Sequence, residues 1–284
     1  DLGLSRAELG LFGSGGDLRT AVEAALPDCR AAAVADPDLA SAWMGQSALW
    51  VRLAEWNLER DEPAEDALTQ VVETAQKALA IDPEDSRALT RLGSAAVLRA
   101  QAAQSNGEDP TVHLAEAVAR FEAALELAPG RFEAIANLGK AHWLAAVHAQ
   151  ESGGDPRDAL AKAGEAYSRV RTEGESDDPE MAVMRSNGGA IWYQRAVWEL
   201  SEGLDPQPSL DRAVEAFEAA GAMNPDLVLA PLNLAYMHAY RAQYLGSLGE
   251  DPTPWWGAAI EAYDRCLEIQ PDHPVALVRC AGVH

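Results

Sequence analysis

Residues 83–129 read PEDSRALTRLGSAAVLRAQAAQSNGEDPTVHLAEAVARFEAALELAP, and this stretch decides the fold. After the proline and its polar neighbours, which are typical of a helix start, apolar residues recur at helical spacing from Ala88 to Ala100. The segment Asn106–Pro110 predicts a turn, because glycine can end one helix in a left-handed conformation and proline can begin the next. A second apolar stripe runs from Leu114 to Leu127 and stops before Pro129. The stretch therefore predicts a helical hairpin with a long first arm.

This hairpin pattern recurs along the chain. The prolines that mark it are separated by 46, 46, 50, 46 and 46 residues: Pro37, Pro83, Pro129, Pro179, Pro225 and Pro271. Self-similarity at a fixed period of this size indicates stacked supersecondary units. We therefore predict an all-α, right-handed superhelical solenoid of helical hairpins with a 46-residue period and an extended first helix.

The period also predicts the domain organisation, a single solenoid over residues 1–284. We expect full repeats at 37–82, 83–128, 129–178, 179–224 and 225–270, a partial repeat at 1–36 and a truncated one at 271–284. Terminal repeats of solenoids usually carry polar outer faces, and neither end of this chain does. We therefore expect the sequence to be part of a longer protein.

The repeated columns resemble a known family. The pattern Ala88-Leu92-Gly93-Ala95, followed by Ala117, Phe121, Ala124 and Pro129, is similar to the tetratricopeptide repeat, whose usual unit is 34 residues. The resemblance covers essentially the whole chain and implies that first helices line a concave surface. The long arms with Gly-x-Asp-Pro turns are similar to repeats appended to bacterial serine/threonine protein kinases, which implies a place in a larger signalling protein.

Two departures from the repeat carry structural expectations. The Leu-Gly pair becomes Gly188-Gly189 in one repeat and Gln46-Ser47 in another, so we expect these two hairpins to pack less well. Four residues are inserted before Pro179, within the acidic segment 173–178, and should lengthen one turn and bend the stack there.

Composition limits the partners. The chain has 45 acidic and 22 basic residues and a formal charge of −23, which argues against binding to nucleic acid or to an anionic membrane surface. No apolar run is long enough to cross a bilayer. The three cysteines, Cys29, Cys266 and Cys280, fall on apolar repeat positions, which favours buried thiols and a reducing, cytoplasmic location. We expect protein or peptide partners, with self-association as a possibility.

The sequence predicts neither catalysis nor a cofactor or metal. The histidines lack the His-Glu-x-x-His spacing of a zinc site, and residues 13–17 are glycine-rich without the lysine of a phosphate loop. Three histidines share one repeat column with two tryptophans, which indicates a packing position: His142, His238, His284, Trp50 and Trp192. We therefore predict that the chain is not an enzyme.

Arginines recur late in the long helices at Arg99, Arg195 and Arg241. An aspartate follows each of them ten residues later, in the turn. We expect the arginines to pair with these turn aspartates, Asp109, Asp205 and Asp251, and ligand binding is the alternative.

One stripe on the first helices predicts the binding site. Asn137, Asn187 and Asn233 occupy equivalent places in three repeats, with Arg91 and Arg279 in register. An amide offers a donor and an acceptor and can therefore pair with the peptide groups of an extended chain. Tetratricopeptide proteins that bind peptides use asparagines in this column, so the resemblance implies the same use here. The alternative is that asparagine is simply common there. The predicted peptide-binding residues are Arg91, Asn137, Lys140, Asn187, Gln194, Asn233, Tyr236, Tyr240 and Arg279.

These observations predict a non-catalytic scaffold. The first-helix stretches carry 11 basic and 12 acidic residues, so the concave wall is close to neutral and the acidity lies on turns and outer helices. A net hydrogen bond contributes about 0.5 to 1.5 kcal/mol and association costs about 4 to 15 kcal/mol, so the asparagines predict micromolar affinity. We expect a regulatory or recruiting arm of a bacterial signalling protein. The alternative is an assembly module that uses the outer face or the solenoid ends.

Overall fold

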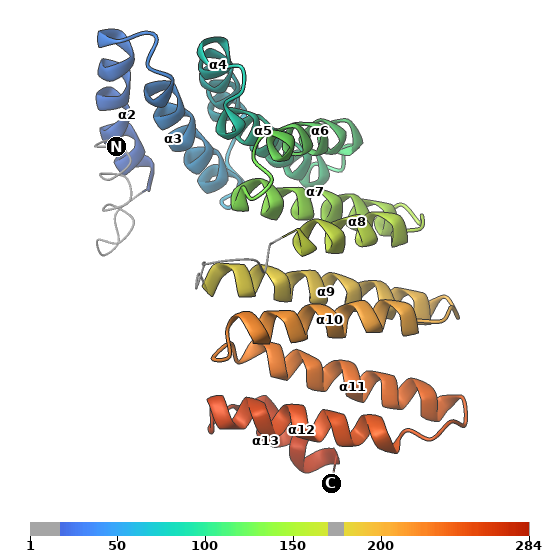
Figure 1. The fold of residues 1–284 in the computed structure, drawn as a ribbon. Coiled ribbons are helices and arrows are strands. Elements are labelled where there is room, and N and C mark those ends of the chain that lie inside the picture. Colours follow the sequence, from blue (N-terminus) through green and yellow to red (C-terminus); the bar gives the residue numbers. More distant parts are fainter. Residues whose placement is uncertain (1–17, 170–178, 284) are drawn as a thin grey trace. The chain divides into compact units, whose positions relative to one another are not determined.

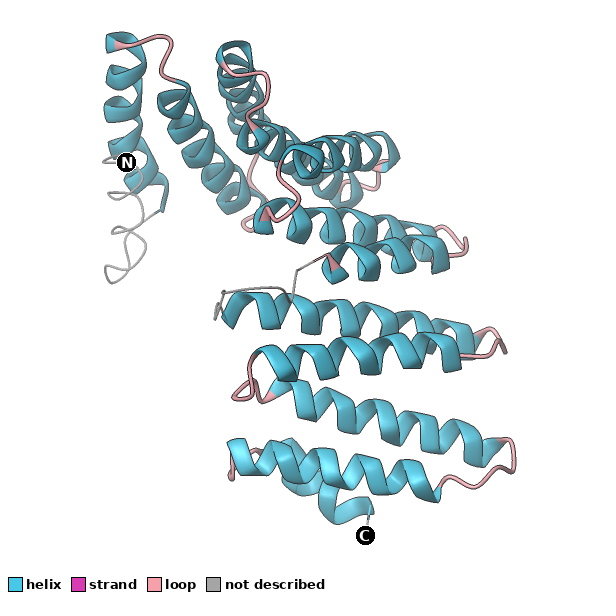
Figure 2. Cartoon of the chain, viewed as in Figure 1, coloured by secondary structure: helices cyan, strands magenta, loops and turns pink. Residues whose placement is uncertain are grey.

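The computed structural model describes residues 18–169 and 179–283, and every regular element in these ranges is an α-helix (Figures 1 and 2). The glycine-rich segment 13–17 and the acidic insertion at 173–178 lie outside the described residues. The chain divides into two compact units, residues 1–148 and residues 149–284, and the division falls in the last turn of one helix. The predicted all-α class is confirmed.

The first unit consists of helices that pack in sequence order. Helix α2 packs against α3, α3 against α4, α4 against α5 and α5 against α6, and the two long helices α3 and α5 also touch each other. Their bounds are α2 (Leu18–Ala35), α3 (Ala40–Leu58), α4 (Glu65–Ile81), α5 (Ser86–Ser105), α6 (Thr111–Leu127) and α7 (Phe132–Glu151).

The second unit repeats this arrangement. Each helix from α8 to α13 packs against the next one (Figure 1), and the long helices α9 and α11 also touch each other. The bounds are α8 (Arg157–Ser168), α9 (Pro179–Ser201), α10 (Gln207–Met223), α11 (Leu229–Ser247), α12 (Thr253–Ile269) and α13 (Pro274–Val283). The predicted long first helix is confirmed: α9 and α11 have 23 and 19 residues, while α10 and α12 have 17 each.

The turn inside each hairpin follows from its sequence. Gly107, Gly153, Gly203 and Gly249 have φ angles of 73°, 72°, 70° and 81°, which side-chain-bearing residues rarely adopt. Two residues after each glycine, an aspartate carboxylate accepts the N–H of the first residue of the following helix. Asp109 accepts from Thr111 N at 2.9 Å in this way. In the first hairpin Asp61, with φ of 55°, takes the glycine's place.

The core consists of the predicted columns. Small residues at Val71, Ala117, Ala213 and Ala259 are fully buried, and so are the rings of Phe121, Phe217 and Tyr263. Each phenylalanine ring lies on a glycine of the preceding helix: a Cβ at Gly93 would stand 2.6 Å from Phe121, and one at Gly189 would stand 2.8 Å from Phe217. A ring and a glycine therefore fill the space together.

The expectation that the Gly188-Gly189 hairpin packs less well is wrong. Gly189 receives Phe217 as Gly93 receives Phe121, so α9 and α10 pack closely. Gly188 in turn lets α9 approach α8, since its Cβ would stand 3.0 Å from Tyr167 Cβ. At the Gln46-Ser47 pair, the Ser47 hydroxyl lies 3.4 Å from the Val71 carbonyl oxygen on α4, so a polar contact joins these helices. Across the described ranges, no helix combines the length and apolarity needed to span a membrane.

Candidate functional site

Two of the predicted site residues of the first unit, Arg91 and Asn137, lie where α5 and α7 face each other. Arg91 forms an ion pair with Glu133, and Asn137 Nδ2 donates to Ser94 Oγ at 3.4 Å. Arg131 Nε donates to Ser86 Oγ at 3.0 Å along the same seam. Arg91 and Asn137 therefore join neighbouring repeats. A ligand that binds them would compete with their contacts to Glu133 and Ser94. The Nε of Arg91 is buried without a hydrogen-bond partner among the described residues.

Lys140, the third predicted residue on this unit, has different surroundings. Its side chain is half-buried on α7, and no described residue accepts a hydrogen bond from its ammonium group. Burial lowers the pKa of Lys140 below its usual value, while the Glu55 carboxylate acts in the opposite direction. Lys140 lines a groove.

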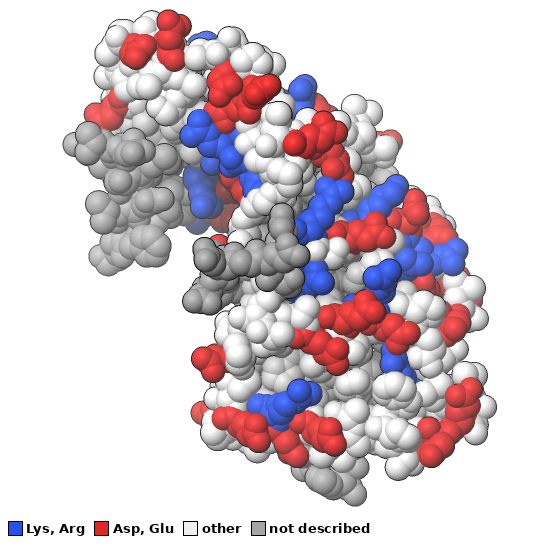
Figure 3. Space-filling model, viewed as in Figure 1, with Lys and Arg blue, Asp and Glu red and all other residues white. Residues whose placement is uncertain are grey.

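This groove lies between the tips of two neighbouring hairpins in the first unit and has a volume of about 1080 Å³. It is formed by the end of α3, the turn that follows, the start of α4 and the end of α5, with His113 of α6 and Lys140 of α7. Sequence reasoning missed the groove, because its walls combine turn residues and helix ends from different repeats. The acidic residues of the turns were a signal for it, and Figure 3 shows acidic side chains distributed over the drawn face of the molecule.

The predicted residues of the second unit lie on α9 and α11. Tyr240 meets Tyr193 edge to face, with ring centres 5.5 Å apart, and Tyr236 meets Tyr263 in the same way at 6.2 Å. Asn187 is exposed and Asn233 is half-buried, one on each of these adjoining helices. Gln194 is half-buried on α9. The two asparagines therefore lie on adjoining helices, which the Tyr193–Tyr240 contact joins.

Apolar side chains accompany these amides. Val183 and Leu229, which belong to the same stripe, are 39% and 48% exposed. The rings of Tyr193 and Tyr240 are half-buried, and this burial raises the pKa of both phenols. The last predicted residue, Arg279, belongs to α13, but its side chain lies outside the described residues.

The predicted pairing of the arginine column with turn aspartates is wrong. Arg99 pairs with Glu65 at 2.8 Å, Arg195 with Glu199 at 2.9 Å, and Arg241 with Asp211. Each partner lies on a helix and not in the turn. The turn aspartates Asp109, Asp205 and Asp251 instead accept backbone N–H groups at the start of the following helix. Arg99 and Arg241 thus each connect a long helix to the preceding short helix, while Arg195 pairs within α9, and all three pairings agree with a structural role.

The column of histidines and tryptophans is a packing column where its side chains are described. Trp192 is buried, and His238 stacks on Trp255 with ring centres 5.9 Å apart. Burial lowers the pKa of His238, and the positive charges of Arg241 and Arg265 lower it further. Within the described ranges, no three histidine, cysteine or acidic side chains are grouped so that they could hold a metal ion.

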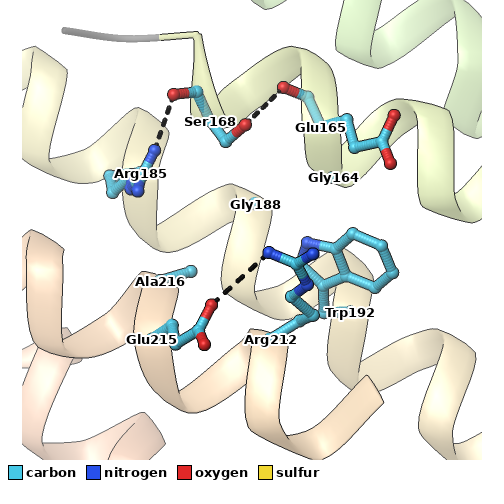
Figure 4. Close-up of a pocket in the computed structure, with 9 residues that line it drawn as sticks. All are labelled: Gly164, Glu165, Ser168, Arg185, Gly188, Trp192, Arg212, Glu215 and Ala216. Atoms are coloured by element: carbon cyan, nitrogen blue, oxygen red, sulfur yellow. Dashed lines mark hydrogen bonds and ion pairs between the residues drawn. The ribbon is translucent and has the colours of Figure 1, made fainter. Parts of the chain in front are cut away.

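A small pocket in the second unit lies between α8, α9 and α10 (Figure 4). Its volume is about 60 Å³, which is room for water and not for a peptide side chain. Arg185 donates to the Ser168 carbonyl oxygen at 2.7 Å, and Arg212 lies 3.6 Å from Glu215. The indole of Trp192 covers Gly164, where a Cβ would stand 2.5 Å from the ring nitrogen. The pocket therefore belongs to the packing between helices.

Comparison with known proteins supports the fold. Residues 67–187 match the family described as plant-specific mitochondrial import receptor subunit TOM20, which is less than half of the chain. The solved structure of the Schizosaccharomyces pombe (S. pombe) nuclear import adaptor Nro1 aligns with a TM-score of 0.69 and 12% identity, covering 98% of this chain and 95% of that one. A second Nro1 structure gives a TM-score of 0.66 and 11% identity, with coverages of 94% and 86%.

A further similar structure is YrrB, described as a TPR protein with an unusual peptide-binding site. It has a TM-score of 0.44 and 20% identity and covers 88% of this chain and 96% of that chain. A comparison with curated proteins gives no match. The repeated helical hairpins and the likeness to Nro1 show that the chain has a tetratricopeptide-like fold of stacked helical hairpins.

Proposed function

We propose that this chain is a non-catalytic scaffold that binds an extended segment of a protein partner along its long helices. In this proposal residues 1–284 form one solenoid, and the protein acts in the cytoplasm as a regulatory or recruiting arm of a larger bacterial signalling protein. The similar structures include one described as an import adaptor and one described as a peptide-binding protein, which agrees with such a role.

The observation that carries the proposal is the surface formed by α9 and α11. Tyr193 and Tyr240 bring these helices together. Asn187 lies six residues before Tyr193 on α9, and Asn233 lies seven residues before Tyr240 on α11. No other described side chain hydrogen-bonds to either amide, so both can donate to and accept from the backbone of a bound chain. Val183 and Leu229 supply apolar contact beside them.

Magnitudes set the expected affinity. Two asparagines with two hydrogen bonds each contribute roughly 2 to 6 kcal/mol. Association costs about 4 to 15 kcal/mol, so apolar contacts with the tyrosines and aliphatic side chains must contribute as well. We therefore expect micromolar binding that depends on backbone contacts more than on the sequence of the segment.

The test is selection of peptides from a displayed random library on the immobilised chain, followed by fluorescence anisotropy with a selected peptide. Replacing both amides (Asn187→Ala with Asn233→Ala) should weaken binding at least tenfold and leave helicity unchanged. The matched control replaces Glu218 and Glu261 by alanine, since both are exposed on the partner helices α10 and α12 of the same hairpins. Equal effects in the two double variants would contradict the proposal.

Assembly is the second candidate, and large exposed aliphatic side chains outside the long helices favour it. Val34 of α2 and Val112 of α6 are 81% and 75% exposed. Trp255, next to Trp256, is engaged within its own unit by His238 and Arg241 and is therefore a weaker candidate for self-association. Light scattering at two concentrations separates the candidates, because self-association raises the apparent mass with concentration and a peptide-binding monomer does not.

A further inference from the structure

We propose that the groove of the first unit is a second binding site, which takes a segment combining apolar and basic side chains. The groove is built from other residues than the α9–α11 surface, so it can be tested separately. Its volume of about 1080 Å³ matches the upper range of ligand sites and can admit several side chains at once.

The floor of the groove is apolar. Leu68, Leu98 and Ala103 are buried beneath it, and Leu58 and Ala102 are half-buried along it. These side chains come from α3, α4 and α5, which pack on one another. A segment that covers this floor removes apolar surface from water, which favours aliphatic or aromatic side chains on its inward face.

The walls of the groove are acidic. Three cations, Arg52, Arg99 and Lys140, face six carboxylates, namely Glu55, Glu59, Asp61, Glu62, Glu65 and Glu108. Two of the cations are already paired inside the groove, Arg52 with Glu55 at 3.3 Å and Arg99 with Glu65 at 2.8 Å.

The remaining carboxylates decide the chemistry of the partner. Glu62 is bound by Arg19 of α2, and Glu59 lies 3.7 Å from Arg60, whereas Asp61 and Glu108 pair with no described cation. Asp61, Glu59 and Glu108 are exposed and therefore reachable. Lysine or arginine side chains on the outer edge of a bound segment would meet these charges, while acidic segments would be repelled.

Lys140 gives the groove a donor for the main chain of the segment. Its half-buried ammonium has no acceptor among the described residues, and Glu55 is the carboxylate that acts on it. A carbonyl oxygen of an extended segment would supply that acceptor. The residue predicted from the sequence as part of an asparagine stripe thus contributes to a separate groove.

The probe is a fluorescein-labelled decapeptide of alternating leucine and lysine, measured by anisotropy against the full chain. Decapeptides of serine with lysine and of leucine with glutamate test the apolar and the basic component. The first variant reverses two groove charges, Glu59→Lys with Glu108→Lys. Its control, Glu84→Lys with Glu126→Lys, makes the same change of net charge on exposed residues outside the groove. A third variant, Ala102→Gln, fills the groove without changing charge.

We expect the leucine–lysine peptide to bind at least tenfold more tightly than either other peptide. The groove reversal and Ala102→Gln should each weaken its binding at least tenfold, and the control reversal less than threefold. Equal loss in both reversals, or equal binding of the serine–lysine peptide, would overturn the inference, because general attraction to an acidic protein explains both results. The Asn187→Ala, Asn233→Ala variant should bind this probe unchanged, which separates failure of this inference from failure of the proposed function.

Discussion

Gly189 of α9 lies directly against the ring of Phe217 on α10, where a Cβ would stand 2.8 Å from two ring carbons. The same relationship joins Gly93 and Phe121 in the first unit. In the next repeat, Ala235 and Tyr263 stand at the equivalent places, and both are buried. A small residue on the long helix therefore matches a ring on the short one.

The first prediction concerns this contact. Gly189→Ala should destabilise the chain by about 1–3 kcal/mol, because the added methyl group must displace a ring that is packed on all sides. Gly257→Ala is the control, since Gly257 lies inside α12 with nothing within 4 Å of its Cβ position. That change should stabilise by about 0.5–1 kcal/mol through helix propensity. Urea unfolding followed by circular dichroism measures both, and destabilisation by both substitutions would contradict the packing account.

The first hairpin turn allows a test of backbone strain. Asp61 has φ of 55°, while the corresponding turns place glycine at this angle. Asp61→Gly should therefore stabilise by a few tenths to about 1 kcal/mol. The opposite change, Gly107→Ala, should destabilise by about 1 kcal/mol, although its Cβ position is open. Thermal unfolding of the two variants should shift in opposite directions, and shifts in the same direction would refute this reading.

Arg241 should contribute more to stability than a surface arginine. It is 6% exposed, pairs with Asp211, and its guanidinium carbon lies 4.5 Å from the ring centre of Trp255. Arg241→Ala should cost about 1–3 kcal/mol through lost packing and lost cation–π contact. Arg212→Ala removes an exposed arginine of α10 and should cost less than about 0.5 kcal/mol. Equal midpoints of chemical unfolding for the two variants would show that the contacts of Arg241 with Asp211 and Trp255 do not stabilise the fold.

Lys140 makes stability depend on pH in a defined direction. Its pKa is lower in the folded chain than the usual value of 10.5, so the unfolded chain binds more protons between the two values. This contribution therefore disfavours folding at neutral pH and disappears as the pH rises towards 10.5. Lys140→Met should stabilise by about 0.5 kcal/mol at pH 7 and by less at pH 10. Denaturant titrations of wild type and variant at both values provide the test, and a gain that grows with pH would have the wrong sign.

The sequence predicts the hairpins and the core well because both are periodic. Glycine and proline determine the turns locally. The repeated columns of Ala117 and Phe121 indicate side chains that are buried between helices in every repeat. The prediction that the Gly188-Gly189 hairpin packs less well is wrong, because the absence of a side chain at Gly189 does not leave a gap. The ring of Phe217 fills that space.

Side-chain partners were harder to predict. Arg99, Arg195 and Arg241 occupy equivalent places, but Arg99 and Arg241 pair with carboxylates of the preceding short helix and Arg195 pairs within its own helix. A long side chain reaches whichever carboxylate the tertiary packing brings near. Asn137 donates to Ser94 because the packing of α7 against α5 brings the two side chains together, and no single repeat shows this contact. The acidic groove could not be predicted from one repeat, since residues of two hairpins and of α7 form its walls.

The most direct test of the central claim is site-specific photo-cross-linking with a peptide selected on the chain. A photoreactive benzoylphenylalanine at Ala190, which is exposed on α9 in the asparagine stripe, is compared with one at Glu261, which is exposed on α12. If an extended segment binds along the long helices, the peptide should cross-link from position 190 and not from position 261. Cross-linking from position 261 alone would place the partner on the short helices and contradict the account.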